Sequence, residues 1–156
     1  MKKSLVVAIL LAGAVFAWRS LRSAQDAGEE TLTRHLWLDR MPDDQRTMVQ
    51  AFIAVKQRRQ AVGLFHHGSA FKIAQEFFSW SASRGALVVE YPQTGEREQV
   101  TYRITPCREE GFTLCMELKG NTRGVRKYRS NEDLEIDGET APDAALARVL
   151  VRQAAR

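Results

Sequence analysis

The chain has 156 residues, of which 44% are hydrophobic and 27% are charged, and its 23 Lys and Arg against 19 Asp and Glu give a formal net charge of +4. This composition is that of an ordinary globular domain, and it excludes a collagen-like, low-complexity or fully disordered chain. A chain of this size can bury one hydrophobic core without a structural metal.

The N-terminal segment predicts export. Lys2 and Lys3 precede a run of 14 apolar or small residues, 5–18, which is typical of a secretory signal peptide. As a helix, this run would rise about 21 Å, which is less than the ~30 Å hydrocarbon core of a bilayer. We therefore expect a cleaved signal peptide within residues 1–27. The alternative is an uncleaved N-terminal anchor, because two arginines follow closely after the run.

Export changes the meaning of the net charge. Residues 28–156 are expected to form a single domain, periplasmic or extracellular, tethered to the membrane only if the N-terminal segment stays attached. That domain carries 19 basic and 18 acidic residues, so most of the net positive charge belongs to the leader. Binding of a nucleic-acid backbone needs several basic side chains acting together. We therefore expect no nucleic-acid partner.

Residues 43–60 are predicted to form an amphipathic helix. Asp43 and Asp44 stand where acidic residues favour a helix N-terminus, and Lys56 is one of three basic residues near the expected C-terminus. The apolar residues between them recur at helical spacing: Met48, Val49, Phe52, Ile53 and Val55.

From residue 61 onward the apolar pattern changes to a period of two, which is typical of strands. Turn residues separate the segments, and no segment between them is long enough for a crossover helix, so the pattern predicts an antiparallel meander. A terminal helix is predicted over residues 140–156, where Leu146, Val149 and Leu150 form an apolar stripe. The apolar segments are 62–66, 71–81, 86–91, 98–106, 112–119 and 125–130.

The expected fold class is therefore α+β. It comprises an antiparallel β-meander of five to six strands, as a curled sheet or half-barrel, with one helix before it and one C-terminal helix. Most aromatic residues fall in the meander, so a curled sheet would have an interior suited to a small apolar ligand. The favoured interpretation is that side chains fill this interior as a solidly packed core. The possible partners are a small apolar ligand or another envelope protein. No cofactor is expected.

The two cysteines, Cys107 and Cys115, are predicted to form a disulfide. Apolar and polar residues alternate over 99–105 and over 112–119, and 108–111 form a turn between them. This parity puts both cysteines on the polar faces of two neighbouring strands, where their sulfurs can meet across a hairpin. An even number of cysteines in an exported chain is typical of such a pair.

The segment His66-His67-Gly68-Ser69 is the candidate for catalysis. A serine close to two histidines suggests a nucleophile with its base, but the segment lacks the second glycine of a nucleophile elbow and has no marked orienting acid. Neighbouring histidines on a strand point to opposite faces, so they do not form a metal site together. We expect no metal, and we treat a small envelope hydrolase centred on this segment as the alternative function.

A basic segment follows the cysteine hairpin. Between Glu117 and Glu132 the chain has five basic residues and no acidic one, which makes this stretch a candidate anion-binding site. The competing interpretation is that the acidic stretch after Glu132 neutralises these cations. The basic residues are Lys119, Arg123, Arg126, Lys127 and Arg129, of which the last four are the candidate ligand residues.

The leading functional hypothesis is an uncharacterised exported envelope protein that acts as a non-catalytic binding or interaction module. We do not expect an enzyme. A purely structural envelope component is a third class.

Overall fold

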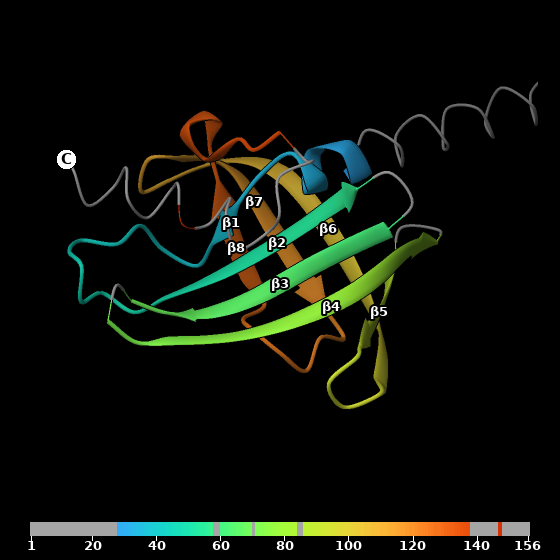
Figure 1. Cartoon of the computed structure of the whole chain (residues 1–156). Coiled ribbons are helices and arrows are strands. Elements are labelled where there is room, and N and C mark those ends of the chain that lie inside the picture. The colour runs from blue at the N-terminus through green and yellow to red at the C-terminus, as the bar shows by residue number, and fades with distance from the viewer. Residues whose placement is uncertain (1–27, 58–59, 70, 84–85, 138–146, 148–156) are drawn as a thin grey trace, which may run out of the picture.

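The computed structural model describes residues 28–57, 60–69, 71–83, 86–137 and 147. Its strands form a closed antiparallel barrel in which each strand pairs with the next in sequence and β1 pairs with β8 (Figure 1). Residues 28–33 form a short helix before the barrel. The elements are β1 (Trp37–Leu38), β2 (Val49–Gln57), β3 (Gln60–Gly68), β4 (Ile73–Ser83), β5 (Ala86–Tyr91), β6 (Glu96–Glu109), β7 (Phe112–Lys119), β8 (Lys127–Ser130) and a 3-10 turn, η1 (Glu132–Leu134).

The expected α+β fold with a five-to-six-strand half-barrel and two helices is wrong, because the strands close into an eight-membered barrel. The antiparallel meander itself is present, and β1 and β2 extend it at its beginning. The helix expected over residues 140–156 and the leader over residues 1–27 lie outside the described residues. Within the described residues, no helix is long and apolar enough to span a membrane.

The helix predicted over 43–60 is also wrong, since Val49–Gln57 is strand β2. Both faces of β2 are buried: Phe52 contributes to the barrel interior, and Ile53 and Val55 belong to a second cluster on the outside. A strand buried on both faces has no polar alternation, so its apolar residues also match helical spacing. Asp44 does not begin a helix but accepts hydrogen bonds from the backbone of its own turn.

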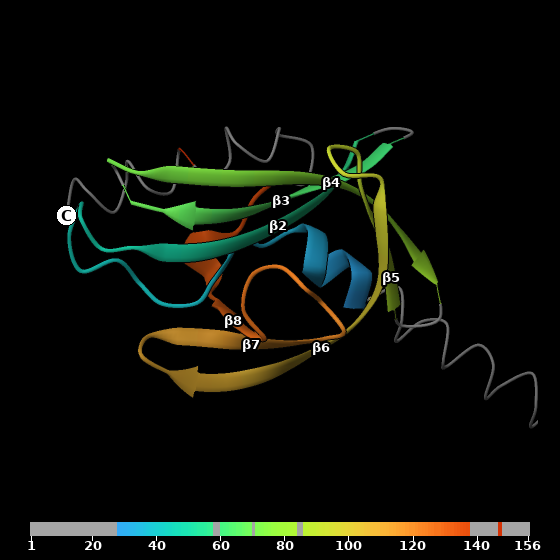
Figure 2. The same cartoon turned by 90° about the horizontal axis from the view of Figure 1, so that it is seen from below.

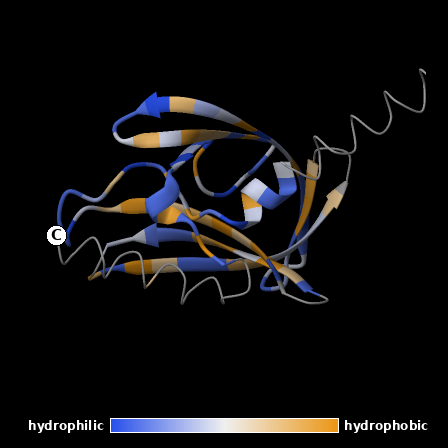
Figure 3. Ribbon diagram, turned by 90° about the horizontal axis from the view of Figure 1, so that it is seen from above, coloured by the Kyte–Doolittle hydropathy of each residue, from blue (hydrophilic) through white to orange (hydrophobic). Residues whose placement is uncertain are grey.

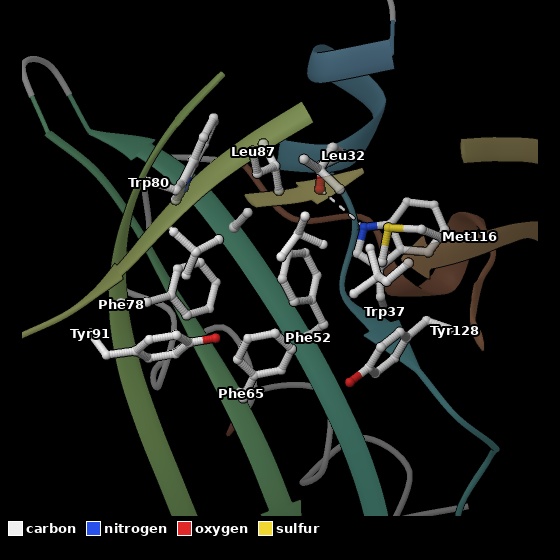
Figure 4. Close-up of a cluster of buried hydrophobic side chains, with 14 residues drawn as sticks. Leu32, Trp37, Phe52, Phe65, Phe78, Trp80, Leu87, Tyr91, Met116 and Tyr128 are labelled. Atoms are coloured by element: carbon white, nitrogen blue, oxygen red, sulfur yellow. Dashed lines mark hydrogen bonds between the residues drawn. The ribbon is translucent and has the colours of Figure 1, made fainter. Parts of the chain in front are cut away.

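Aromatic and aliphatic side chains occupy the barrel interior. Along the strands, hydrophobic residues are interspersed with hydrophilic ones (Figure 3). Phe65 and Phe78 have ring centroids 5.1 Å apart, and Phe52 stacks on Phe78 at 5.7 Å. Trp37 donates its indole N–H to the carbonyl oxygen of Leu32, which brings the helical segment into the same core (Figure 4). Fourteen buried side chains form this cluster, which agrees with the packed core favoured by the sequence.

Alternate connections of an up-and-down barrel lie at the same end. Residues 39–48, 69–72, 92–95 and 120–126 therefore share one end, which we call the lid end because residues 120–126 fold across it. Figure 2 shows this β7–β8 connection lying between β6 and β7 on one side and β2 to β4 on the other. The other end carries the 28–33 helix, where Glu29 pairs with Lys56 near the end of β2.

Candidate functional site

The loop 120–126, the lid, packs directly on the barrel interior. The amide N–H of Val125 donates to the hydroxyl oxygen of Tyr128 at 3.0 Å. A Cβ at Gly124 would lie 2.2 Å from that hydroxyl oxygen and 2.8 Å from a ring carbon of Phe65, and the φ angle of Gly124 is +70°. Only glycine fits here, because both the space and the backbone conformation exclude a side chain.

Arg123 holds the lid to the barrel wall. Its Nε donates to Glu76 of β4 at 2.9 Å, its Nη2 donates to Glu96 at the start of β6, and its guanidinium lies 3.8 Å above the Tyr91 ring. The Arg123 partner holds the pKa of Glu96 below its usual value. Arg123 was a candidate anion-binding residue, but the structure already places two carboxylates on its guanidinium.

Glu98 forms a second tie between the lid and the wall. The Thr122 backbone N–H and hydroxyl both donate to Glu98, at 2.9 and 2.8 Å, and the Tyr91 hydroxyl donates to its other carboxylate oxygen. Burial, followed by the hydrogen bond to Glu98, raises the pKa of Tyr91 well above its usual value, so this phenol remains a donor. No sequence pattern links these residues, because they come from three separate segments.

Two further candidate cations share one acidic partner. Lys127 Nζ lies 2.7 Å from Glu109 Oε1, and Arg129 Nε lies 2.9 Å from Glu109 Oε2. Hydrogen bonds from Lys127 and then Arg129 lower the pKa of Glu109. Arg129 also donates to the carbonyl oxygen of Asp39. The acid that pairs with both cations thus comes from β6.

Arg126, the fourth candidate, lies beside an open surface groove of about 540 Å³ between the end of β7 and the start of β8. Lys119 lines the same groove, and both side chains are exposed. Neither forms an ion pair or a side-chain hydrogen bond within the described part of the chain. We call this site the basic groove. Its full lining is Glu117, Leu118, Lys119, Gly120, Asn121, Arg126 and Lys127.

The groove is more basic than a second surface groove of about 570 Å³ near Asp39. That second groove contains Arg40 and Arg129, but each basic side chain contacts Asp39, and Asp43 and Glu110 add acidic charge. In the basic groove, three cations accompany the single acid Glu117. The basic groove is therefore the better site for an anion.

Exposed apolar residues gather elsewhere on the lid end. Phe71 is 72% exposed and Ile73 is 62% exposed at the turn between β3 and β4, with exposed Lys72 between them. Met48, 36% exposed, precedes Val49, which pairs with Gly68 at the same turn. We call Phe71, Lys72 and Ile73 the apolar tip. The strand prediction over 71–81 did not identify it, because the pattern does not show which apolar residues stay uncovered.

The proposed nucleophile and base are not assembled. The Ser69 hydroxyl oxygen accepts a hydrogen bond from the Phe71 backbone N–H at 3.3 Å, and within the described residues it has no bond to either histidine. His66 is 3% exposed with its Nε2 unpartnered, whereas His67 is exposed. Burial, and secondarily His67, lower the pKa of His66. Among the described residues, no group of three or more His, Cys, Asp or Glu is placed to hold a metal ion.

Cys107 and Cys115 lie at disulfide distance, as the sequence predicts, with their Cα atoms 5.7 Å apart. Cys115 pairs with Thr105 across the β6–β7 ladder, and the register shifts between Pro106 and Glu109. The pair therefore links β6 and β7 at the irregular part of this hairpin.

The chemistry that the basic groove offers is recognition of an anion. It presents a guanidinium and an ammonium to a carboxylate, phosphate or sulfate. Comparison of the chain with protein-family models, with curated proteins and with solved structures finds no match.

Proposed function

We propose that this protein is an exported, non-catalytic binding module of the cell envelope that binds anionic groups in the basic groove. One observation carries the proposal: Arg126 and Lys119 both line an open groove, and neither has an ion pair with an acidic side chain in the described residues. The other basic residues of the same segment each have a carboxylate, so the groove is where positive charge remains available.

The chemistry of the two side chains supports an anion with several oxygen atoms. Arginine presents a planar fork that matches two oxygens of a carboxylate or phosphate, and lysine adds a mobile point charge. Two exposed cations bind a single anion weakly in water, because solvent and salt screen the interaction. A ligand with repeated anionic groups fits better, since it engages the groove at several points.

The hydrolase alternative has no comparable support, because Ser69 has no hydrogen bond to His66 or His67 within the described residues. The role of a cup for a small apolar ligand is not favoured either, because contacting side chains occupy the barrel interior. Export remains part of the proposal, and its support is the N-terminal sequence pattern together with the Cys107–Cys115 pair.

Binding of the full-length protein to dextran sulfate at several salt concentrations tests the groove. The variant Lys119→Gln/Arg126→Gln should bind at least tenfold more weakly in low salt and release about two fewer counterions, as judged from the salt dependence. The matched control is Arg34→Gln/Arg108→Gln, which removes the same charge near the opposite end of the barrel. Equal losses in the two double variants would show a nonspecific effect of net charge and would refute the groove.

A further inference from the structure

We infer that the anionic partner is a lipid surface and that the lid end is the part of the protein that contacts it. The binding of anionic headgroups rests on the proposed function of the basic groove. The insertion of apolar side chains rests on the apolar tip. In the contact, Lys119 and Arg126 bind headgroups, and Phe71 and Ile73 insert at the boundary between headgroups and acyl chains.

Topology places the two features together. The β3–β4 turn with the apolar tip and the β7–β8 connection with the basic groove are alternate connections of one barrel, so both lie at the lid end. The ion pair between Arg123 of the lid and Glu76 joins the β7–β8 connection to β4, and Glu76 is three residues along that strand from Ile73. A single planar surface at this end can therefore contact both.

The apolar tip has the composition of an interfacial segment. Phe71 and Ile73 are the two most exposed large apolar side chains among the described residues, at 72% and 62%. Exposure of this size on two neighbouring apolar side chains, one in the turn and one at the start of β4, is unfavourable in water and indicates a contact surface. Lys72 lies between them, and a lysine can keep its ammonium at headgroup level while its stem follows the apolar side chains inward.

The charges at the lid end agree with an anionic surface. Lys72, Lys119 and Arg126 are exposed and unpaired within the described residues. Many of the acids at this end are engaged inside the protein: Glu76, Glu96 and Glu98 by the lid and Tyr91, and Asp44 by the backbone of its own turn. Asp44 and Glu96 are themselves exposed, and Asp43, Glu90 and Glu117 are exposed acids without such a partner among the described residues. A soluble polyanion would satisfy the cations but would leave the apolar tip in water.

Co-sedimentation with phosphatidylcholine vesicles, with or without 30% phosphatidylglycerol, tests this inference on the full-length protein, with dextran sulfate binding measured in parallel. Phe71→Ser/Ile73→Ser should weaken binding to anionic vesicles at least tenfold and leave dextran sulfate binding unchanged. Phe77→Ser, which removes a 42% exposed aromatic from the body of β4, is the matched control and should have little effect. Near-UV circular dichroism confirms that each variant is folded.

The outcomes separate the two proposals. If the apolar-tip variant binds anionic vesicles like the wild type, or if vesicles without phosphatidylglycerol bind equally well, the lipid surface is refuted while groove binding to dextran sulfate stands. If Lys119→Gln/Arg126→Gln leaves dextran sulfate binding intact, the proposed function itself fails. Loss of another protein's binding in the apolar-tip variant, with vesicle binding unchanged, would assign the tip to a protein partner and overturn the inference.

Discussion

At the scale of single residues, His66 is the least satisfied buried polar group of the barrel wall. Its Nδ1 lies 3.4 Å from the Gln75 amide nitrogen, and its Nε2 has no partner. It points outward from β3, between Ala51 of β2 and Gln75 of β4, on the face that carries the second apolar cluster. A buried imidazole without a carboxylate partner is more stable neutral than charged.

Acid should therefore destabilise the fold through His66. Burial lowers the pKa of His66 below the 6.5 of the unfolded chain, so the unfolded state binds more protons between the two values. The contribution is fully present above pH 6.5 and is lost as the pH falls through the folded pKa. Urea unfolding at pH 7.5 and 5.0 should show a smaller decrease in stability for His66→Gln than for the wild type. The exposed neighbour gives the control, His67→Gln, and an equal decrease in all three proteins would contradict the assignment.

At the scale of elements, the lid is held by its glycine and by its ion pairs. Gly124 lets the loop approach Tyr128 and Phe65, and Arg123 ties it to Glu76 and Glu96. Closing the barrel end in this way covers aromatic side chains of the interior and also shapes the basic groove, whose lining includes the lid residues Gly120, Asn121 and Arg126.

Two glycine substitutions separate backbone conformation from crowding in the lid. Gly124 and Gly95 both have positive φ, at +70° and +72°, but a Cβ at Gly95 meets nothing within 4 Å. Both Gly→Ala changes share the cost of a left-handed conformation, about 1 to 2 kcal/mol. Gly124→Ala should cost at least about 1 kcal/mol more than Gly95→Ala in urea unfolding, because its methyl group displaces Tyr128 or the lid. Equal costs would mean that the lid adapts to a side chain without strain.

At the scale of the whole molecule, the barrel closes along its shortest pairing. β1 has two residues and meets β8 in the single register pair of Leu38 with Arg129. Two side chains of β8 strengthen this seam: Ser130 donates to the Leu36 carbonyl oxygen at 2.8 Å, and Arg129 donates to the Asp39 carbonyl oxygen. Ser130 and Leu36 are fully buried, so the serine bond has no competition from water.

The seam should be where the barrel opens first. Ser130→Ala leaves the Leu36 carbonyl without its hydroxyl donor and should cost about 1 to 2 kcal/mol. Hydrogen exchange of the amides in β1 and β8 should accelerate more than exchange in β3 and β4. Ser81→Ala, on the exposed face of β4, is the control and should change neither quantity. Uniform acceleration in all strands would show that the barrel opens only as a unit.

The sequence predicts the local features well and the closure poorly. Alternation of apolar and polar residues identified the hairpins between residues 86 and 119. The same alternation put Cys107 and Cys115 on the same face of neighbouring strands, which predicted their pairing. The same rule failed for β2, because a strand buried on both faces lacks alternation. The printed acidic partners of the basic segment lie far from it in the sequence: they are Glu76, Glu96 and Glu109 of the barrel.

Residue order by itself determined the meander, its turns and the cysteine pairing, because these depend on side-chain direction along one strand and on neighbours a few residues away. The tertiary structure alone decided that the strands close, which cations keep a free charge and which apolar side chains stay in water. Those properties depend on contacts between segments separated by tens of residues, such as Arg123 with Glu76. The basic groove and the apolar tip are what these contacts leave uncovered.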